Sequence, residues 1–198
     1  MTAAPLVLAP AQAGWAELGR AARACTACAE LAAGRTTVVV GECPPGAAVL
    51  LVGEAPGAQE DERGVPFVGR AGALLDELLD RAGLPRDRVA VANVLKCRPP
   101  GNRKPTRQEV ATCRPWLDRQ LALADPRVVV TLGGTAAEWA LGPGVRVGVA
   151  REQVHRLGGR SLLVTYHPSA ALRFGPAGAP RAALLEDLSR AAALATAG

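Results

Sequence analysis

Aromatic side chains are scarce in this sequence. Its 198 residues include two Phe, three Trp and one Tyr, or 3% of the chain, whereas 49% of the residues are hydrophobic. The core must therefore be mainly aliphatic, and an aromatic ring in a loop calls for a specific role. The length fits one ordinary domain.

Long apolar runs are absent as well. No stretch approaches the roughly 20 residues that a membrane-spanning helix requires, so we expect no membrane partner. The N-terminal MTAAPLVLAPAQAGW lacks a basic segment, and Pro5 and Pro10 interrupt its apolar run, which argues against a signal peptide. We expect a cytoplasmic monomer, with a flexible lead-in over residues 1–20 and a single domain over residues 21–198.

The chain is basic, with a net charge of +5 and a pI near 9.3. This balance makes an anionic partner plausible without proving one. The loop KCRPPGNRKP and the residues after it place Arg98, Arg103, Lys104 and Arg107 close together. Such a cluster suits phosphate groups, although a charged loop can equally be a solvated surface.

Short apolar segments alternate with segments of helical periodicity. Strands are expected at 36–40, 48–52, 89–95, 127–132 and 161–166, with a strand or hairpin near 145–154. Helices are expected at 15–31, 71–82, 106–124, from 133 onward, and 180–195. The alternation is typical of a parallel sheet with helices on both faces. In such folds ligands bind beyond the carboxyl ends of the strands.

Five cysteines are present, and in a reducing cytosol they are more typical of thiols or metal ligands than of disulfides. Cys25 and Cys28 form a C-x-x-C pair, and Cys97 and Cys113 follow far downstream. Four thiolates could hold zinc or an iron–sulfur cluster, or the side chains could simply be buried. Cys43 stands beside two prolines without a partner, so we interpret it as a structural thiol.

Residues 53–72, GEAPGAQEDERGVPFVGRAG, form a turn-rich segment after an expected strand. Glu54 could orient a water molecule as a general base, or it could be a solvated acid. Phe67 could stack on a flat ligand, or it could pack the loop onto the core.

Two further polar residues occur at the ends of expected strands. Asn93, within VAVANVLK, offers both a donor and an acceptor, as a nucleobase edge requires, or it is a turn residue. His167, in TYHPSAALR, could donate a hydrogen bond to developing negative charge, or it could be structural. His155 falls in an expected exposed hairpin, where we assign it no chemical role.

These signals occur together in a known order. The 53–72 segment, then Asn93-Val94, then Tyr166-His167-Pro168-Ser169 resemble the family 4 uracil-DNA glycosylases over nearly the whole chain after about residue 20. The resemblance implies a three-layer α/β/α sandwich with a central, mostly parallel four-stranded sheet. It also implies a 4Fe-4S cluster beside the sheet, held by Cys25, Cys28, Cys97 and Cys113.

The resemblance further implies a DNA repair enzyme. Such an enzyme flips uracil out of single- or double-stranded DNA, hydrolyses its N-glycosidic bond, releases free uracil and leaves an abasic site. The implied uracil-binding residues are Glu54, Ala55, Glu60, Phe67, Asn93 and His167. Among them, Glu54 would position the attacking water and His167 would stabilise the departing uracil anion.

Contacts to the DNA are implied at two places. Arg98, Arg103 and Lys104 would contact phosphates, and Leu172 and Arg173 would enter or brace the minor groove. Two other functions stay open from the residues themselves: a non-catalytic DNA-binding module with a four-cysteine zinc site, and an enzyme that acts on free nucleotides.

Overall fold

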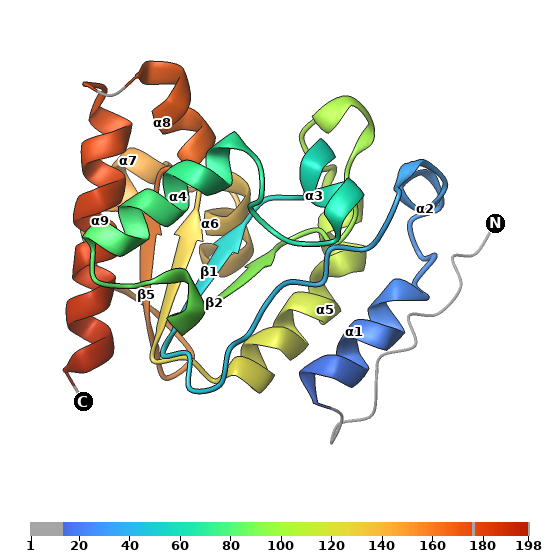
Figure 1. Ribbon diagram of the computed structural model, residues 1–198, viewed down its shortest axis with the longest axis horizontal. Helices are drawn as coiled ribbons and strands as arrows, with labels where there is room; N and C mark the ends of the chain where they lie inside the picture. The colour runs from blue at the N-terminus through green and yellow to red at the C-terminus, as the bar shows by residue number, and fades with distance from the viewer. Residues whose placement is uncertain (1–13, 176, 198) are drawn as a thin grey trace.

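The computed structural model describes residues 14–175 and 177–197. Within these residues the chain forms one sheet of five strands in the order β2-β1-β3-β5-β4 (Figure 1). The strands are β1 Val49–Gly53, β2 Val89–Asn93, β3 Val128–Leu132, β4 His155–Leu157 and β5 Arg160–Thr165. The first three and β5 pair in parallel, and β4 pairs antiparallel with β5.

The expected count of four strands is therefore wrong by one edge strand. β4 and β5 form a hairpin in which Leu157 pairs with Arg160, so Gly158 and Gly159 are its two-residue loop. Gly158 has a φ of +59°, the left-handed conformation that such tight hairpin loops require. The expected strand or hairpin near 145–154 begins later than predicted, because residues 147–150 form the short helix α7.

Nine helices are present in the described part of the chain. They are α1 Trp15–Arg23, α2 Ala29–Gly34, α3 Ala58–Arg63, α4 Arg70–Arg81, α5 Arg107–Ala124, α6 Gly134–Leu141, α7 Val147–Ala150, α8 Pro168–Phe174 and α9 Ala179–Thr196. Two 3₁₀ turns, Arg86–Arg88 and Pro100–Asn102, lie in the loops. None of these helices is long and apolar enough to cross a membrane.

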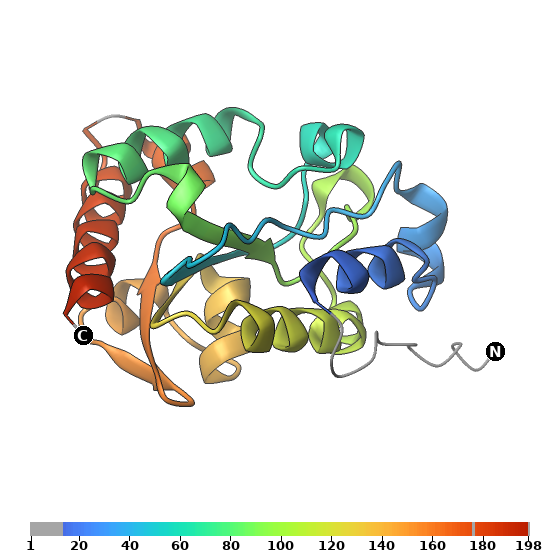
Figure 2. The same cartoon turned by 60° about the horizontal axis from the view of Figure 1, so that its bottom comes forward.

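Helices cover both faces of the sheet, as predicted. In the tilted view of Figure 2, α4 lies on one side of the strands and α5 on the other. Side chains alternate between the two faces along each strand. Val49 and Leu51 of β1 belong to the core cluster that includes α4 and α9, whereas Leu50 and Val52 belong to the cluster that includes α5 and α6.

The region before β1 differs from expectation in two ways. The single helix expected over 15–31 is two helices, and the C-x-x-C segment occupies the turn between them, where Cys28 has extended backbone as the N-cap of α2. The strand expected at 36–40 is not part of the sheet. Val38, Val39 and Val40 are buried, so the β-branched run indicates burial and not strand pairing.

The boundary expected at residue 20 falls inside α1, whose Leu18 is 1% exposed. The expected lead-in otherwise lies mostly outside the described residues. By contrast, the helix expected from 106 is confirmed as α5. The side chain of Thr106 accepts from Glu109 N, and Glu109 accepts in return from Thr106 N at 2.7 Å, a capping box. Pro115 lies within the helix without ending it.

Two glycines permit the chain to pack closely around Phe67. A Cβ on Gly72, in the first turn of α4, would lie 1.8 Å from the Phe67 carbonyl oxygen. A Cβ on Gly53, at the end of β1, would lie 2.4 Å from Asn93 Oδ1 and 2.6 Å from Phe67 Cζ. Both contacts are far shorter than real Cβ contacts, so a larger residue at either position would force its neighbours to move, the Phe67 backbone at Gly72 and the Asn93 and Phe67 side chains at Gly53.

We expect Gly72→Ala to lower the free energy of unfolding by about 1–3 kcal/mol, because the loop backbone must move to admit the methyl group. Chemical denaturation measures the change. Gly34→Ala is the matched control, since nothing lies within 4 Å of a Cβ there; it should be neutral or stabilising. Equal stability of the two variants would contradict the close approach at Gly72.

Candidate active site

The parallel strands bring their carboxyl ends to one edge of the sheet. Glu54 follows β1, Asn93 ends β2, Gly133 follows β3, and His167 follows β5 by two residues. Residues that are distant in the sequence therefore meet at this edge, which is where ligands bind in open parallel sheets.

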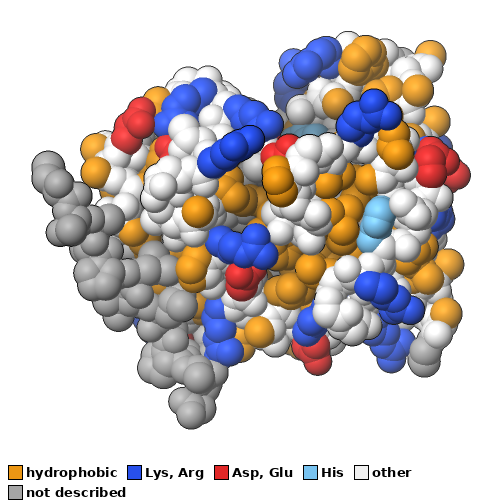
Figure 3. All heavy atoms as spheres, turned by 180° about the vertical axis from the view of Figure 1, so that it is seen from behind, with side chains coloured by type: hydrophobic (Ala, Val, Ile, Leu, Met, Phe, Trp, Pro, Cys, Tyr) orange, Lys and Arg blue, Asp and Glu red, His pale blue; other side chains and the backbone are white. Residues whose placement is uncertain are grey.

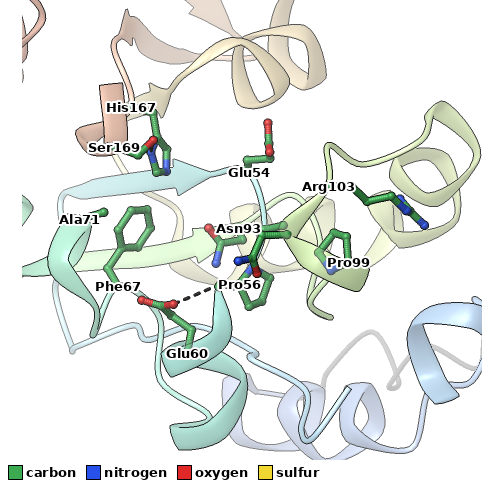
Figure 4. Close-up of a pocket in the computed structure, with 13 residues that line it drawn as sticks. Glu54, Pro56, Glu60, Phe67, Ala71, Asn93, Pro99, Arg103, His167 and Ser169 are labelled. Carbon is green, nitrogen blue, oxygen red and sulfur yellow. Dashed lines mark hydrogen bonds between the residues drawn. The ribbon is translucent and has the colours of Figure 1, made fainter. Parts of the chain in front are cut away.

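A cavity of about 250 Å³ opens at this edge (Figure 4). Its lining includes all six residues that the sequence analysis assigned to base binding: Glu54, Ala55, Glu60, Phe67, Asn93 and His167. Pro99, Asn102 and Arg103, from the loop before α5, close another side. The cavity thus joins apolar, aromatic and hydrogen-bonding groups around one small space.

Asn93 presents an unpaired polar group to the cavity. Its side chain is 2% exposed, and its Oδ1 is buried without a hydrogen-bond partner among the described residues. A buried acceptor without a partner is costly, so a ligand donor is the natural complement. The backbone of Asn93 is fixed in turn, because the Lys96 ammonium donates to its carbonyl oxygen.

The loop that carries Phe67 is held by a carboxylate. Glu60 of α3 accepts from the backbone N–H groups of Val68 and Gly69, each at 2.9 Å, and from Gly57 N at 3.1 Å. From the other side Arg86 donates to the carbonyl oxygen of Pro66 at 2.8 Å. These bonds fix the backbone on both sides of Phe67.

Phe67 itself has a φ of 54°, a left-handed conformation that is strained for a bulky residue. Its ring is 7% exposed and lies 5.7 Å from the His167 ring, with 32° between the ring planes. The surrounding hydrogen bonds and the close contact with Gly72 maintain this conformation. The result is a flat aromatic surface at the cavity wall.

His167 is held in one tautomer. It is the N-cap of α8, and its Nδ1 accepts from the backbone N–H of Ser169 at 3.1 Å. Because an amide N–H can only donate, Nδ1 is unprotonated and the ring proton of the neutral form is on Nε2. Burial of the ring lowers the pKa of His167 to about 4, and the charge of Glu60 only partly opposes this. The ring is therefore a neutral donor at physiological pH.

Glu54 is fixed both through its backbone and through its side chain. Its carbonyl oxygen accepts from Leu95 N at 3.0 Å. Its Oε2 accepts a short hydrogen bond from Thr135 Oγ1, in the first turn of α6. The other oxygen, Oε1, has no hydrogen-bond partner within residues 14–175 and 177–197. Glu54 thus offers one free carboxylate oxygen at the cavity.

The four cysteines of the predicted metal site line a second cavity. Cys25 and Cys28 from the α1–α2 turn meet Cys97 and Cys113 there, with Arg35, Lys96 and Trp116 beside them. Cys43 lies elsewhere and packs against the hydrophobic core cluster that includes residues of α5 and α6. No three His, Cys, Asp or Glu side chains among the described residues are arranged to hold a single metal ion.

Donors point at the sulfurs of this cavity. The Arg35 guanidinium donates to Cys97 Sγ at 3.1 Å, and Lys96 N donates to Cys113 Sγ at 3.4 Å. Burial, reinforced by the neighbouring thiols, raises the pKa of Cys28 to about 11. Burial likewise raises the pKa of Cys113 to about 12. Thiolates in this cavity need positive charge nearby, as any metal centre would supply.

Basic side chains line a groove of their own, separate from the cavity at the sheet edge. Seen from behind, Lys and Arg side chains lie on both sides of a hollow at the upper edge of the molecule (Figure 3). Lys104, Arg107 and Arg114 line a groove of about 530 Å³. Thr135, whose hydroxyl donates to Glu54, also lines this groove. Lys104 and Arg107 are exposed.

Arg103 differs from its neighbours in the basic loop. Its guanidinium donates to both oxygens of Glu109, at 2.7 and 2.9 Å, and contacts Glu30 at 3.1 Å. These bonds, with Glu109 foremost, raise the pKa of Arg103. In Figure 4 its side chain extends away from Asn93 and Phe67. Arg103 therefore fastens the loop to α5 and α2.

Helix α8 carries the predicted minor-groove residues away from the cavity. His167 caps its start, and Leu172 and Arg173 lie near its end. Leu172 is 36% exposed, and Phe174 is 65% exposed. Phe174 was not among the predicted site residues, because no sequence motif signals its exposure. Thr135 and Arg86 were not predicted either, because the residues they bind, Glu54 and Pro66, are distant in the sequence.

The fold and the cavity define an α/β protein with a cavity at the carboxyl edge of its sheet that has the groups to hold a flat, polar ligand. The sequence matches the family model of the Uracil DNA glycosylase superfamily over residues 40–189. The chain belongs to this superfamily.

Individual proteins of the superfamily are also similar to this chain. A Type-4 uracil-DNA glycosylase of Thermotoga maritima is 44% identical over 170 residues, which cover 84% of this chain and 87% of that protein. One of Pyrobaculum aerophilum is 42% identical over 150 residues, covering 70% of this chain and 75% of that protein. A Type-5 uracil-DNA glycosylase of Thermus thermophilus is 40% identical over 145 residues, which cover 63% of this chain and 66% of that protein.

The tautomer of His167 can be measured directly. We expect ¹⁵N NMR to show Nε2 protonated and Nδ1 unprotonated from about pH 8 down to about pH 5. Charging should occur with a midpoint near pH 4, because burial disfavours the imidazolium. A titration near pH 6.5, the ordinary imidazole value, would contradict this assignment.

Proposed function

We propose that the cavity at the sheet edge receives a uracil base flipped out of DNA and that its residues cleave the N-glycosidic bond. The chain is a uracil-DNA glycosylase, as its family and its relatives of 37–44% identity support. The observation that carries the proposed site is the buried, unpaired Oδ1 of Asn93 inside a cavity that also holds Phe67 and His167.

Recognition of uracil uses groups that are already fixed. Asn93 Oδ1 accepts from the N3–H of the base, and its amide N–H donates to a ring carbonyl. The Phe67 ring covers one face. Flipping a base out of a duplex costs roughly a few kcal/mol, and the rigid pocket recovers that cost through stacking and hydrogen bonding without reorganising.

Cleavage separates charge at two places. When the bond between N1 and C1′ breaks, its electron pair passes to uracil, and the sugar gains oxocarbenium character. His167 Nε2–H donates to the uracil carbonyl oxygen on which negative charge accumulates. A neutral donor suffices, so no proton need be transferred at this step.

Hydrolysis then completes the reaction. Glu54 Oε1 accepts a hydrogen bond from a water molecule and directs its oxygen to C1′, while the carboxylate charge stabilises the sugar cation. The water oxygen bonds to C1′ and its proton passes to Glu54. Glu54 then gives up this proton and the uracil anion takes one up at N1, so the products are free uracil and an abasic site. Glu60 acts indirectly, because its oxygens already bind the backbone that presents Phe67.

The DNA follows the basic groove. We assign phosphate contacts to Arg98, which donates to Asn102 Oδ1 in the same loop, and to Lys104 and Arg107, which line one groove. Arg103 has a supporting role because Glu109 and Glu30 engage it. Leu172 and Arg173 extend from the helix that His167 begins, so they contact the strand beside the flipped base.

The four-cysteine cavity suits a 4Fe-4S cluster. Cys25, Cys28, Cys97 and Cys113 would hold it, and the donors from Arg35 and Lys96 are of the kind that surround such sulfurs. Bound there, the cluster would supply a covalent link between the α1–α2 turn and the loop before α5. This chain's own residues carry out the bond cleavage at the other cavity.

Uracil excision tests the proposed site. Wild-type protein should release uracil from single- and double-stranded oligonucleotides, seen as strand breakage after alkali treatment. Asn93→Ala should reduce the excision rate about 100-fold or more, as loss of a buried, oriented hydrogen-bonding group does. Gln108→Ala, which removes an exposed amide from α5, should leave the rate unchanged. Full activity of Asn93→Ala would refute the assigned recognition.

The cluster proposal requires a metal analysis. Anaerobically purified protein should be brown and contain about four iron and four sulfide per chain. Cys97→Ser should lose the iron and melt at a lower temperature, because metal-binding free energy stabilises the fold. Cys43→Ser should keep both the iron and the stability. A colourless protein that contains zinc would favour the zinc site instead.

A further inference from the structure

Thr135 is the only described residue that hydrogen-bonds to the side chain of Glu54. We propose that Thr135 is a positioning residue for the glycosylase reaction: its hydroxyl fixes the Glu54 carboxylate so that Oε1 faces the water and the sugar. The inference rests on the proposed role of Glu54. Thr135 acts through Glu54, and no contact between Thr135 and the substrate is required.

The hydroxyl is placed by a rigid part of the fold. Gly133 N donates to the Thr165 carbonyl oxygen at 2.9 Å, so β5 anchors the start of α6. Gly133 has a φ of +89°, and a Cβ there would lie 3.1 Å from His167 Cβ. The turn that precedes Thr135 is therefore packed directly against the residue that binds the leaving group.

Thr135 is itself buried and has few conformations open to it. It is 5% exposed, and a β-branched side chain in a helix has few χ1 choices. Because Thr135 is the second residue of α6, no earlier turn of that helix offers its hydroxyl a carbonyl oxygen, the acceptor that threonines deeper in helices commonly use. Here the hydroxyl bonds instead to a carboxylate 81 positions earlier in the chain, and a bond to a charged group is stronger than one between neutral groups.

Glu54 needs such a partner because its own side chain is flexible. Backbone bonds from Val94 N to the Gly53 oxygen and from Leu95 N to the Glu54 oxygen fix only the main chain. Several rotatable bonds separate that main chain from the carboxylate, which is half-buried. A misplacement of about 1 Å at a reacting group can cost about 100-fold in rate.

The test compares three threonine variants. Thr135→Val keeps the shape but removes the donor, and it should lower the single-turnover excision rate about 10–100-fold with the affinity for uracil-containing DNA within about 2-fold. Thr135→Ser restores the donor and should recover most of the rate. Thr131→Val is the matched control, because it removes a buried hydroxyl that bonds to the Leu163 carbonyl oxygen and not to Glu54.

A double-mutant cycle separates positioning from general structural support. In a Glu54→Ala background, Thr135→Val should slow excision by no more than about 2-fold, because the two residues act as one unit. A purely structural Thr135 would lose the same factor in both backgrounds, together with melting temperature, and that result would overturn the proposal.

The remaining outcomes distinguish the proposal from the role on which it rests. Wild-type rates for Thr135→Val beside a slow Glu54→Ala would refute positioning by Thr135 and leave the proposed role of Glu54 intact. A wild-type rate for Glu54→Ala would refute the role of Glu54 itself, and the positioning role with it. Loss of activity in Thr135→Ser equal to that in Thr135→Val would show that a hydroxyl at this position is not sufficient, and it would overturn the positioning role.

Discussion

The Glu60 carboxylate is the interaction on which the shape of the cavity depends. It accepts three backbone N–H groups, from Gly57, Val68 and Gly69, and so joins the two ends of a turn-rich segment that has little regular structure of its own. Hydrogen bonds from backbone amides to an ionised carboxylate are among the stronger ones in proteins. Phe67 keeps its left-handed conformation because the bonds on both sides of it leave no alternative.

The electrostatics of the site follow from where each group is placed. His167 and Glu54 both lie at the carboxyl edge of the sheet, yet burial keeps the imidazole neutral while Thr135 stabilises the carboxylate by a hydrogen bond. In the proposed reaction, His167 therefore serves the leaving group, which gains negative charge, and Glu54 serves the sugar, which gains positive charge. In the proposed function, Lys104 and Arg107 lie outside both and attract phosphates over a longer range.

Local chemistry determined which features could be predicted from sequence. The capping box at Thr106 and Glu109 involves neighbours in the chain, and Asn93 stood out as an amide in an apolar run. Features that depend on distant partners could not be seen. Thr135 looks like any threonine at a helix start until Glu54 is placed beside it.

The errors have the same origin. The valines at 38–40 are typical of a strand, but they are buried beside the sheet edge and pair with no strand. The helical spacing over 15–31 is present, but the segment forms two helices, and Cys25 and Cys28 lie in the turn between them. The hairpin of β4 was misplaced because its strand is short and partly polar.

Helix α3 has six residues, and two adjacent side chains on it hold different segments. Glu60 binds the loop of Phe67, whereas Asp61, which is 2% exposed, accepts from Thr36 N at 2.9 Å and Thr37 N at 3.4 Å. Those threonines directly follow Arg35, which contacts Cys97 Sγ. Successive residues of a helix point about 100° apart, so an inserted or deleted residue in α3 would turn one carboxylate away from its segment. The length of this helix therefore affects both the cavity at the sheet edge and the four-cysteine cavity, although α3 lines only the first of them.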